Sequence, residues 1–185
     1  RSTPSTSSAA SDVYKRQVLG CVDSDWSKIG LSKIEYDFVT SKLAIGVLSI
    51  HINQYSRSIF IECLHEESSK SNNLEKARER GAKLVKQFNK AKIEEVELIS
   101  LSSSDLSLYV AEGMALANYQ FLKYFSAPEK KLNSLKAIFV NAESSVIHNI
   151  NAIVSGTLYA RDFVNEPLSY FCLLYTSPSP RDGIG

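Results

Sequence analysis

The chain has 185 residues and is almost electrically neutral, with 21 lysine and arginine residues against 20 aspartate and glutamate residues. This balance does not favour binding to nucleic acid or to an anionic membrane, because both need an excess of positive charge. No apolar run approaches the roughly 18 residues that a membrane-spanning helix requires. The three cysteines show no paired spacing, which is typical of a reduced, cytoplasmic protein rather than a disulfide-stabilised one.

Both ends of the sequence resemble translated sequencing adapter. Residues 7–17, SSAASDVYKRQ, match one reading frame of a common library adapter, and residues 172–182, CLLYTSPSPRD, match the reverse complement of the opposite adapter. A serine- and proline-rich disordered tail at each end is the alternative. We therefore expect residues 1–17 and 172–185 to be adapter-derived and disordered. Residues 18–171 are then the natural part, long enough for one compact core.

The first half of the natural part predicts strands followed by a helix. Between 34 and 52, two runs rich in apolar, β-branched and aromatic residues, 36–39 and 43–48, predict strands, and residues 59–64 predict another. A polar loop at 66–73 then leads into a helix with apolar residues at helical spacing. The residues of this apolar face are Leu74, Ala77, Gly81, Leu84, Val85 and Phe88.

The second half alternates strands and helices. Residues 96–101 and 135–140 predict strands. Between them, the serine-rich stretch 102–105 can cap a helix whose apolar stripe runs from Leu106 to about Phe125, before a proline breaks it. Strands and helices in this order predict an α/β domain with a mostly parallel mixed central sheet and helices on both faces.

Residues 144–167 predict a long helix that follows the last strand. Ser144 or Ser145 can cap its start, and Pro167 ends it because proline has no amide hydrogen. The predicted apolar stripe consists of Val146, Ile150, Ile153, Thr157, Ala160 and Val164, and is widened by Ile147, Val154 and Leu158. A helix of this length needs a large apolar partner surface, and we expect part of that surface to lie outside this chain.

The residues show no pattern of a catalytic or ligand-binding site. Residues 65–67, His-Glu-Glu, begin like a zinc-protease motif, but Ser69 stands where the second histidine would be. Gly113 and Gly156 lie inside helical patterns without neighbouring glycines, so close helix packing explains them better than a phosphate loop. We therefore assign no catalytic, cofactor-binding or metal-binding residue.

Two segments resemble the leucyl (cytosol) aminopeptidase family. Residues 111–124, AEGMALANYQFLKY, are similar to a helix of that family with a Glu-Gly, small, Tyr-x-Phe, Tyr pattern. Residues 159–167, YARDFVNEP, are similar to the family's Ala-Arg-Asp-Leu-Val-Asn-Glu-Pro segment, in which Phe163 replaces the commoner leucine. The second motif is the more specific of the two.

The resemblance implies a division of the chain. Residues 18–143 would be a macrodomain-like, three-layer amino-terminal α/β domain, and residues 144–167 the inter-domain helix. Residues 168–171 would be the truncated start of a catalytic domain. The amino-terminal domain is non-catalytic in this family, so the partner implied for this chain is its own missing catalytic domain.

The resemblance also implies the activity of the parent protein. It would be a cytoplasmic, hexameric exopeptidase that removes amino-terminal residues from peptides with two divalent ions, zinc or manganese. The family's metal ligands and catalytic residues lie in the carboxy-terminal domain. We therefore expect the chain itself to be inactive.

Two other readings stay open. One is a stand-alone macrodomain-like module that binds ADP-ribose or a related nucleotide. Such a module needs a glycine-rich phosphate-binding loop after a central strand, and the glycines of residues 18–171 are not clustered. The other is a catalytically inactive scaffold homologue of the same family.

Overall fold

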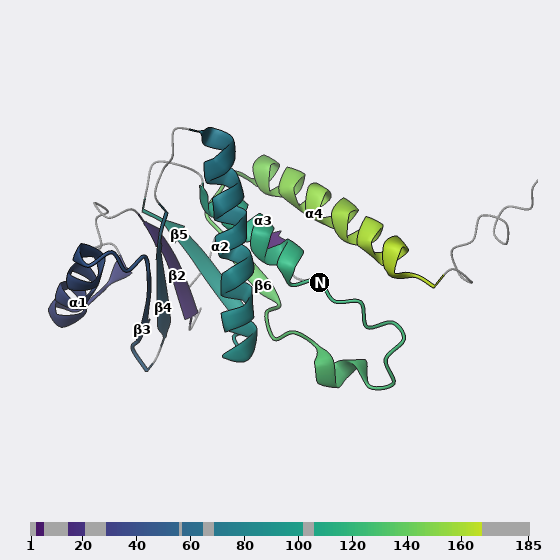
Figure 1. Ribbon diagram of the computed structural model, residues 1–185, viewed down its shortest axis with the longest axis horizontal. Helices are drawn as coiled ribbons and strands as arrows, with labels where there is room; N and C mark the ends of the chain where they lie inside the picture. Colours follow the sequence, from purple (N-terminus) through teal and green to yellow (C-terminus); the bar gives the residue numbers. More distant parts are fainter. Residues whose placement is uncertain are drawn as a thin grey trace, which may run out of the picture.

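The computed structural model describes residues 3–5, 15–20, 29–55, 57–64, 69–101 and 106–167. These residues form an α/β fold around a six-stranded sheet with the strand order β1-β6-β5-β2-β4-β3 (Figure 1). The strands are β1 (Thr3–Ser5), β2 (Lys15–Gly20), β3 (Ser49–Asn53), β4 (Ser58–Cys63), β5 (Glu95–Ser100) and β6 (Ala137–Val140). Among these described strands, only β3 and β4 pair in the antiparallel sense. The predicted mostly parallel mixed sheet is confirmed.

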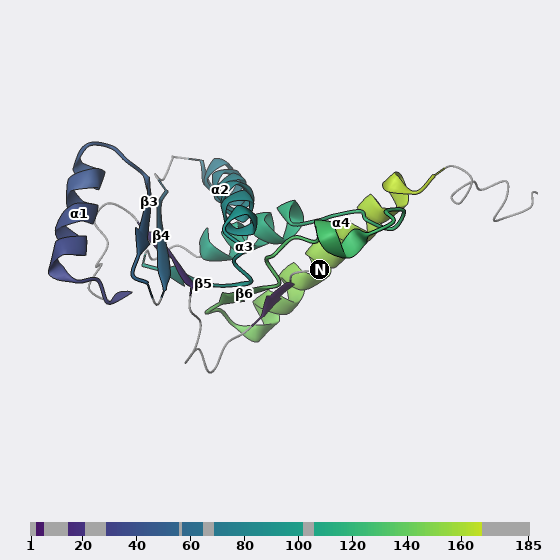
Figure 2. The same cartoon turned by 90° about the horizontal axis from the view of Figure 1, so that it is seen from below.

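Helices cover both faces of the sheet, as predicted (Figure 2). The helices are α1 (Lys33–Ala44), α2 (Lys70–Lys90), α3 (Leu106–Ala117) and α4 (Ser144–Asn165), with a short 3₁₀ helix η2 (Pro128–Lys131). On one face, Val39 and Leu43 of α1 pack with Ile59 and Ile61 of β4. On the other face, α2, α3 and α4 share a larger core with β5 and β6.

The structure places β1 and the first half of β2 within residues 1–17, where we expected disorder. The backbone of β2 pairs in parallel with β4 on one side and with β5 on the other. Backbone pairing requires no particular side chain, so a strand can form here whatever the origin of these residues. The segments 168–171 and 172–185 lie outside the described residues.

The prediction of strands between 34 and 48 is wrong, because residues 33–44 form the helix α1 and residues 45–48 form a turn and the link to β3. Ser32 and Glu35 form a capping box at its start: the Ser32 amide donates to the Glu35 carboxylate at 2.7 Å, and the Glu35 amide donates to Ser32 Oγ at 3.4 Å. Gly46 has a φ of +80° and follows the last turn, where its amide and that of Val47 donate to Leu43 and Lys42. This pattern is a Schellman motif. Both ends of the helix are therefore fixed locally, which outweighs the strand preference of its β-branched and aromatic residues.

Three strands and one helix agree with the predictions. The segments predicted as 59–64, 96–101 and 135–140 correspond to β4, β5 and β6. The helix predicted to follow the 66–73 loop is α2, although it begins earlier, at Lys70. Its buried face is the predicted one.

α2 and α3 cross with their backbones in direct contact. A Cβ atom on Gly113 would lie 2.2 Å from the carbonyl oxygen of Arg78, and one on Gly81 would lie 2.2 Å from that of Val110. Each helix thus contributes a glycine at the point where the other helix comes closest. Arg78 also forms an ion pair with Glu112 at 2.9 Å. Close helix packing, predicted for Gly113, is confirmed.

α4 buries a different face from the one predicted. Ile147, Ile150, Val154 and Leu158 are its buried residues, so the positions expected to widen the stripe supply most of the contact. Ile153 is 57% exposed and Val164 is 85% exposed. Apolar residues lie on two sides of this helix, and the periodicity alone does not show which side faces the core.

Two smaller predictions about α4 are also wrong. Glu143, not a serine, is the N-cap residue, and its side chain makes no capping bond. Gly156 has no heavy atom of the described chain within 4 Å of the position that a Cβ would occupy. Helix packing within these residues therefore does not explain this glycine.

Glu62 on β4 is a buried acid facing α2. It is 3% exposed and accepts a hydrogen bond from Ser49 Oγ at 2.5 Å, while Arg80 Nη1 lies 3.7 Å from the other carboxylate oxygen. Burial raises the pKa of Glu62 above its ordinary value, and Ser49 and Arg80 only partly oppose this shift. The ionised form is therefore disfavoured in the folded state.

We predict that Gly113→Ala lowers the free energy of unfolding by about 3 kcal/mol, because the new methyl group must displace the backbone of α2. Gly156→Ala is the matched control, because it brings the same gain in helix propensity but its methyl group would have no described atom within 4 Å. We expect this variant to be more stable than the wild type by about 0.5–1 kcal/mol. Urea unfolding of both variants measures the difference. Equal effects of the two substitutions would contradict the close crossing of α2 and α3.

We predict that Glu62→Gln makes the chain more stable than the wild type above pH 4.5, the ordinary pKa of a glutamate. The pKa of Glu62 is higher in the folded state than in the unfolded chain, so rising pH lowers the free energy of unfolding of the wild type, whereas the glutamine of the variant does not titrate. The difference in free energy of unfolding between variant and wild type should therefore grow from pH 4.5 up to the folded pKa and then level off. Urea unfolding across this range measures it, and a gap independent of pH would refute the explanation.

Candidate functional site

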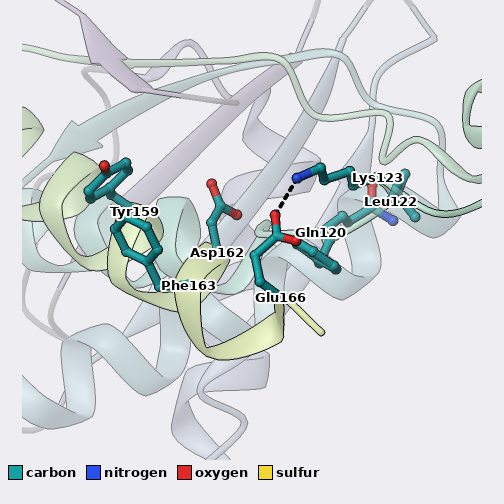
Figure 3. A pocket seen from close by; sticks show the side chains of 8 residues that line it. Gln120, Leu122, Lys123, Tyr159, Asp162, Phe163 and Glu166 are labelled. Carbon is teal, nitrogen blue, oxygen red and sulfur yellow. Dashed lines mark hydrogen bonds and ion pairs between the residues drawn. The ribbon is translucent and has the colours of Figure 1, made fainter. Parts of the chain in front are cut away.

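The two segments singled out in the sequence lie against each other at one end of the fold. Residues 111–124 form most of α3 and the irregular segment that follows it, and residues 159–167 form the last turns of α4 and the chain just beyond. Figure 3 shows Tyr159, Asp162 and Phe163 on the last turns of α4, and Glu166 just after the helix. Together with Gln120, Leu122 and Lys123 of the irregular segment, they line one cavity. The contact between these two segments is the candidate functional site.

α3 ends at Ala117, eight residues before the predicted end near Phe125. The next residue, Asn118, accepts a hydrogen bond from Asn89 Nδ2 at 3.0 Å and donates one to the carbonyl oxygen of Leu135 at 2.8 Å. Its own carbonyl accepts from Asn133 Nδ2 at 3.1 Å. These bonds tie the chain to α2 and to the segment before β6, so the helix stops here although the apolar pattern continues.

Arg161 and Asp162 of α4 hold the end of α3. The guanidinium of Arg161 donates to the carbonyl oxygen of Leu116 at 2.6 Å, which satisfies one of the free carbonyls in the last turn of α3. The hydroxyl of Tyr119 donates to Asp162 Oδ1 at 2.9 Å. Asn165 Nδ2 donates to the same Tyr119 oxygen at 3.1 Å.

Glu166 makes the last contact between the two segments. Lys123 Nζ lies 2.5 Å from Glu166 Oε1, and the hydroxyl of Tyr124 donates to Oε2. Hydrogen bonds from Lys123 first, and then from Tyr124, lower the pKa of Glu166. The same carboxylate raises the pKa of Lys123 and of Tyr124.

We call this set of contacts the clamp. It joins Arg161, Asp162 and Asn165 of α4 and Glu166, the residue after this helix, to their partners Leu116, Tyr119, Lys123 and Tyr124. Arg161 and Asn165 are four residues apart and Asp162 is next to Arg161, so the three helical residues share one side of α4. Each polar residue of the Arg-Asp-x-x-Asn-Glu motif therefore has a partner in the other motif.

A cavity of about 530 Å³ lies between the two sides of the clamp. Its walls include Asp162 and Glu166, and also the rings of Tyr159 and Phe163, which contact each other edge to face at 4.3 Å. The two segments therefore meet through polar contacts around a space and not through a packed apolar interface.

Among the described residues, the two histidines and the one cysteine lie outside the clamp. His51 stacks on Phe60 with ring centroids 4.2 Å apart, and His148 is exposed on α4. Cys63 is buried in the core beside α1. Residues 65–67 lie outside the described part of the chain.

Within the described ranges, no group of three histidine, cysteine, aspartate or glutamate residues is arranged to hold a metal ion. In the same ranges, no helix is both long and apolar enough to span a membrane. The clamp itself pairs each carboxylate with a hydroxyl or ammonium group. It offers hydrogen bonds and one ion pair, which suit holding two segments together.

Sequence reasoning identified both motifs but none of the contacts between them. The clamp partners lie more than 40 residues apart in the chain. The spacing of residues 161, 162, 165 and 166 was the available signal, because residues three to four apart lie on one side of a helix and can meet a common partner.

Solved structures that match this chain include two aminopeptidases. A mutant of tomato leucine aminopeptidase matches 92% of this chain and 39% of its own, with a TM-score of 0.64 and 11% identity. An M17 aminopeptidase from Trypanosoma brucei matches 86% of this chain and 35% of its own, with a TM-score of 0.49 and 10% identity. At 11% identity the likeness to the tomato enzyme is one of fold, and this chain spans about two fifths of that enzyme's length.

Comparison with models of known protein families finds no match. No curated protein matches the sequence either.

We predict that Glu166 titrates below pH 4.5, its ordinary value, and that Lys123→Met raises the midpoint. The contribution of Glu166 to stability is present above pH 4.5 and is lost as the pH falls through its lower folded pKa. NMR titration of the Glu166 carboxyl carbon measures the midpoint. Lys136→Met, which removes the 2.9 Å ion pair with Glu94, is the control and should leave the titration midpoint of Glu166 unchanged. A Glu166 midpoint that does not respond to Lys123→Met would contradict the ion pair.

Proposed function

We propose that this chain is the non-catalytic amino-terminal domain of an aminopeptidase of the leucyl aminopeptidase family. The observation that carries the proposal is the clamp: two separate motifs that resemble this family meet in the fold and pair residue by residue. The fold likeness to tomato leucine aminopeptidase, with a TM-score of 0.64, supports it.

In this proposal the domain holds and orients a second domain that carries the chemistry. α4 is the inter-domain helix, and the clamp fixes its last turns before the chain passes Pro167. The domain would have the macrodomain-like, three-layer architecture of the family. Residues 1–17 and 172–185 would be translated adapter, and residues 168–171 the beginning of the catalytic domain.

The parent protein would be a cytoplasmic, hexameric peptidase that releases amino-terminal residues from peptides. Two divalent ions, zinc or manganese, would activate the attacking water in its catalytic domain. The clamp residues do not fit such a centre, since Asp162 and Glu166 are already paired with Tyr119, Lys123 and Tyr124. We therefore place the metal ligands outside this chain.

The parent gene provides the test. We predict that the full-length product releases leucine from leucine amide when manganese is present, and that the 185-residue chain does not. Removing the metal with a chelator should abolish the activity, and adding manganese back should restore it. A folded full-length protein that shows no release with manganese would contradict the proposed activity.

Titration of the 185-residue chain with ADP-ribose separates this proposal from the nucleotide-binding alternative. We expect no heat of binding in calorimetry. Saturable binding in the micromolar range would instead support a stand-alone binding module.

A further inference from the structure

The first and last parts of α4 are attached to the fold by different forces. The buried apolar residues of this helix all lie between Ile147 and Leu158, and none lies in its last turns. Beyond Leu158 no described residue of the helix is buried: Tyr159 is 59% exposed and Val164 is 85% exposed. Apolar burial therefore fixes the first part of α4, and something else must hold the last turns.

The clamp is what holds the last turns. Arg161 reaches the end of α3, and Asp162 and Asn165 share the Tyr119 hydroxyl. Glu166 pairs with Lys123, and their side chains are 14% and 56% exposed. An ion pair that water reaches on its lysine side is weak and is screened by salt, so this contact can break at low cost compared with the apolar core.

The cavity between the two sides is consistent with a contact that opens. A packed apolar interface would resist separation, because opening it would expose buried surface to water. Here a cavity of about 530 Å³ lies beside the polar contacts and is lined by residues of both segments. Figure 3 shows the Lys123–Glu166 ion pair as a bridge across one side of this space.

We propose that residues 159–166 open and close against residues 116–124 as one unit, while the rest of α4 stays in place. The clamp is then a polar latch that sets the direction in which the chain leaves the domain at Pro167. Opening is a property of this chain alone. Its use to change the orientation of a catalytic domain rests on the proposed function.

Hydrogen–deuterium exchange of the 185-residue chain tests the latch. The double variant Glu166→Gln with Tyr119→Phe weakens the Lys123 pair and removes the hydroxyl that joins Asp162 to Asn165. We expect amide exchange in residues 159–166 to become about tenfold faster, with unchanged exchange in α2, α3 and residues 144–158. Lys136→Met, which removes the exposed pair with Glu94, is the control and should change nothing in α4.

A salt series on the unmodified chain gives a second measurement that does not depend on the variant folding. Raising the salt from about 0.05 M to about 1 M should speed exchange in residues 159–166 and leave residues 144–158 unaffected. Exchange that responds neither to the variant nor to salt would overturn the proposal. So would exchange that rises together in 159–166, 144–158 and α3, because the last turns would then not open as a separate unit.

Discussion

The contact between the backbones of α2 and α3 is the constraint on which the rest of the structure depends. Gly81 and Gly113 each face a carbonyl oxygen of the opposite helix, so the two axes approach more closely than any side chain would permit. This approach fixes where α3 ends relative to α2. It thereby allows Asn89 of α2 to bind Asn118, the residue at which the chain turns away from the helix. The Glu-Gly pair of the first family-like motif is thus explained by packing, with Glu112 paired to Arg78 and Gly113 at the crossing.

The turn at Asn118 sets the position of the irregular segment 119–124. This segment supplies Tyr119, Lys123 and Tyr124, which are partners in the clamp. The tyrosines and the lysine of the first motif lie where the polar side of α4 can reach them. The contacts of the first motif therefore give it a physical purpose, which is to hold the last turns of α4 in one direction. Charged and hydroxyl groups suit this purpose because their geometry is directional, whereas apolar contacts fix distance more than angle.

The sequence predicts the elements whose apolar pattern is unambiguous and misses those that depend on local caps or distant partners. α2 follows from its helical periodicity, and the strands β4, β5 and β6 follow from their runs of apolar, β-branched and aromatic residues. α1 was missed because its residue types favour strands, although Ser32, Glu35 and Gly46 carried the opposite signal. The end of α3 was not predictable, since Asn118 stops the helix through partners far away in the chain. For the candidate site, resemblance located the two motifs, but only the fold shows that they touch.

The place of β2 in the sheet bears on the order in which the chain folds. This strand comes early in the sequence, yet both of its neighbours, β4 and β5, come later and are themselves joined by the crossover helix α2. The hairpin of β3 and β4 and the pair of α2 and α3 are built from nearer segments, so they can form first. We therefore expect the central strand to insert late, between edges of β4 and β5 that have already formed. Until then these two edges would be open to mispairing.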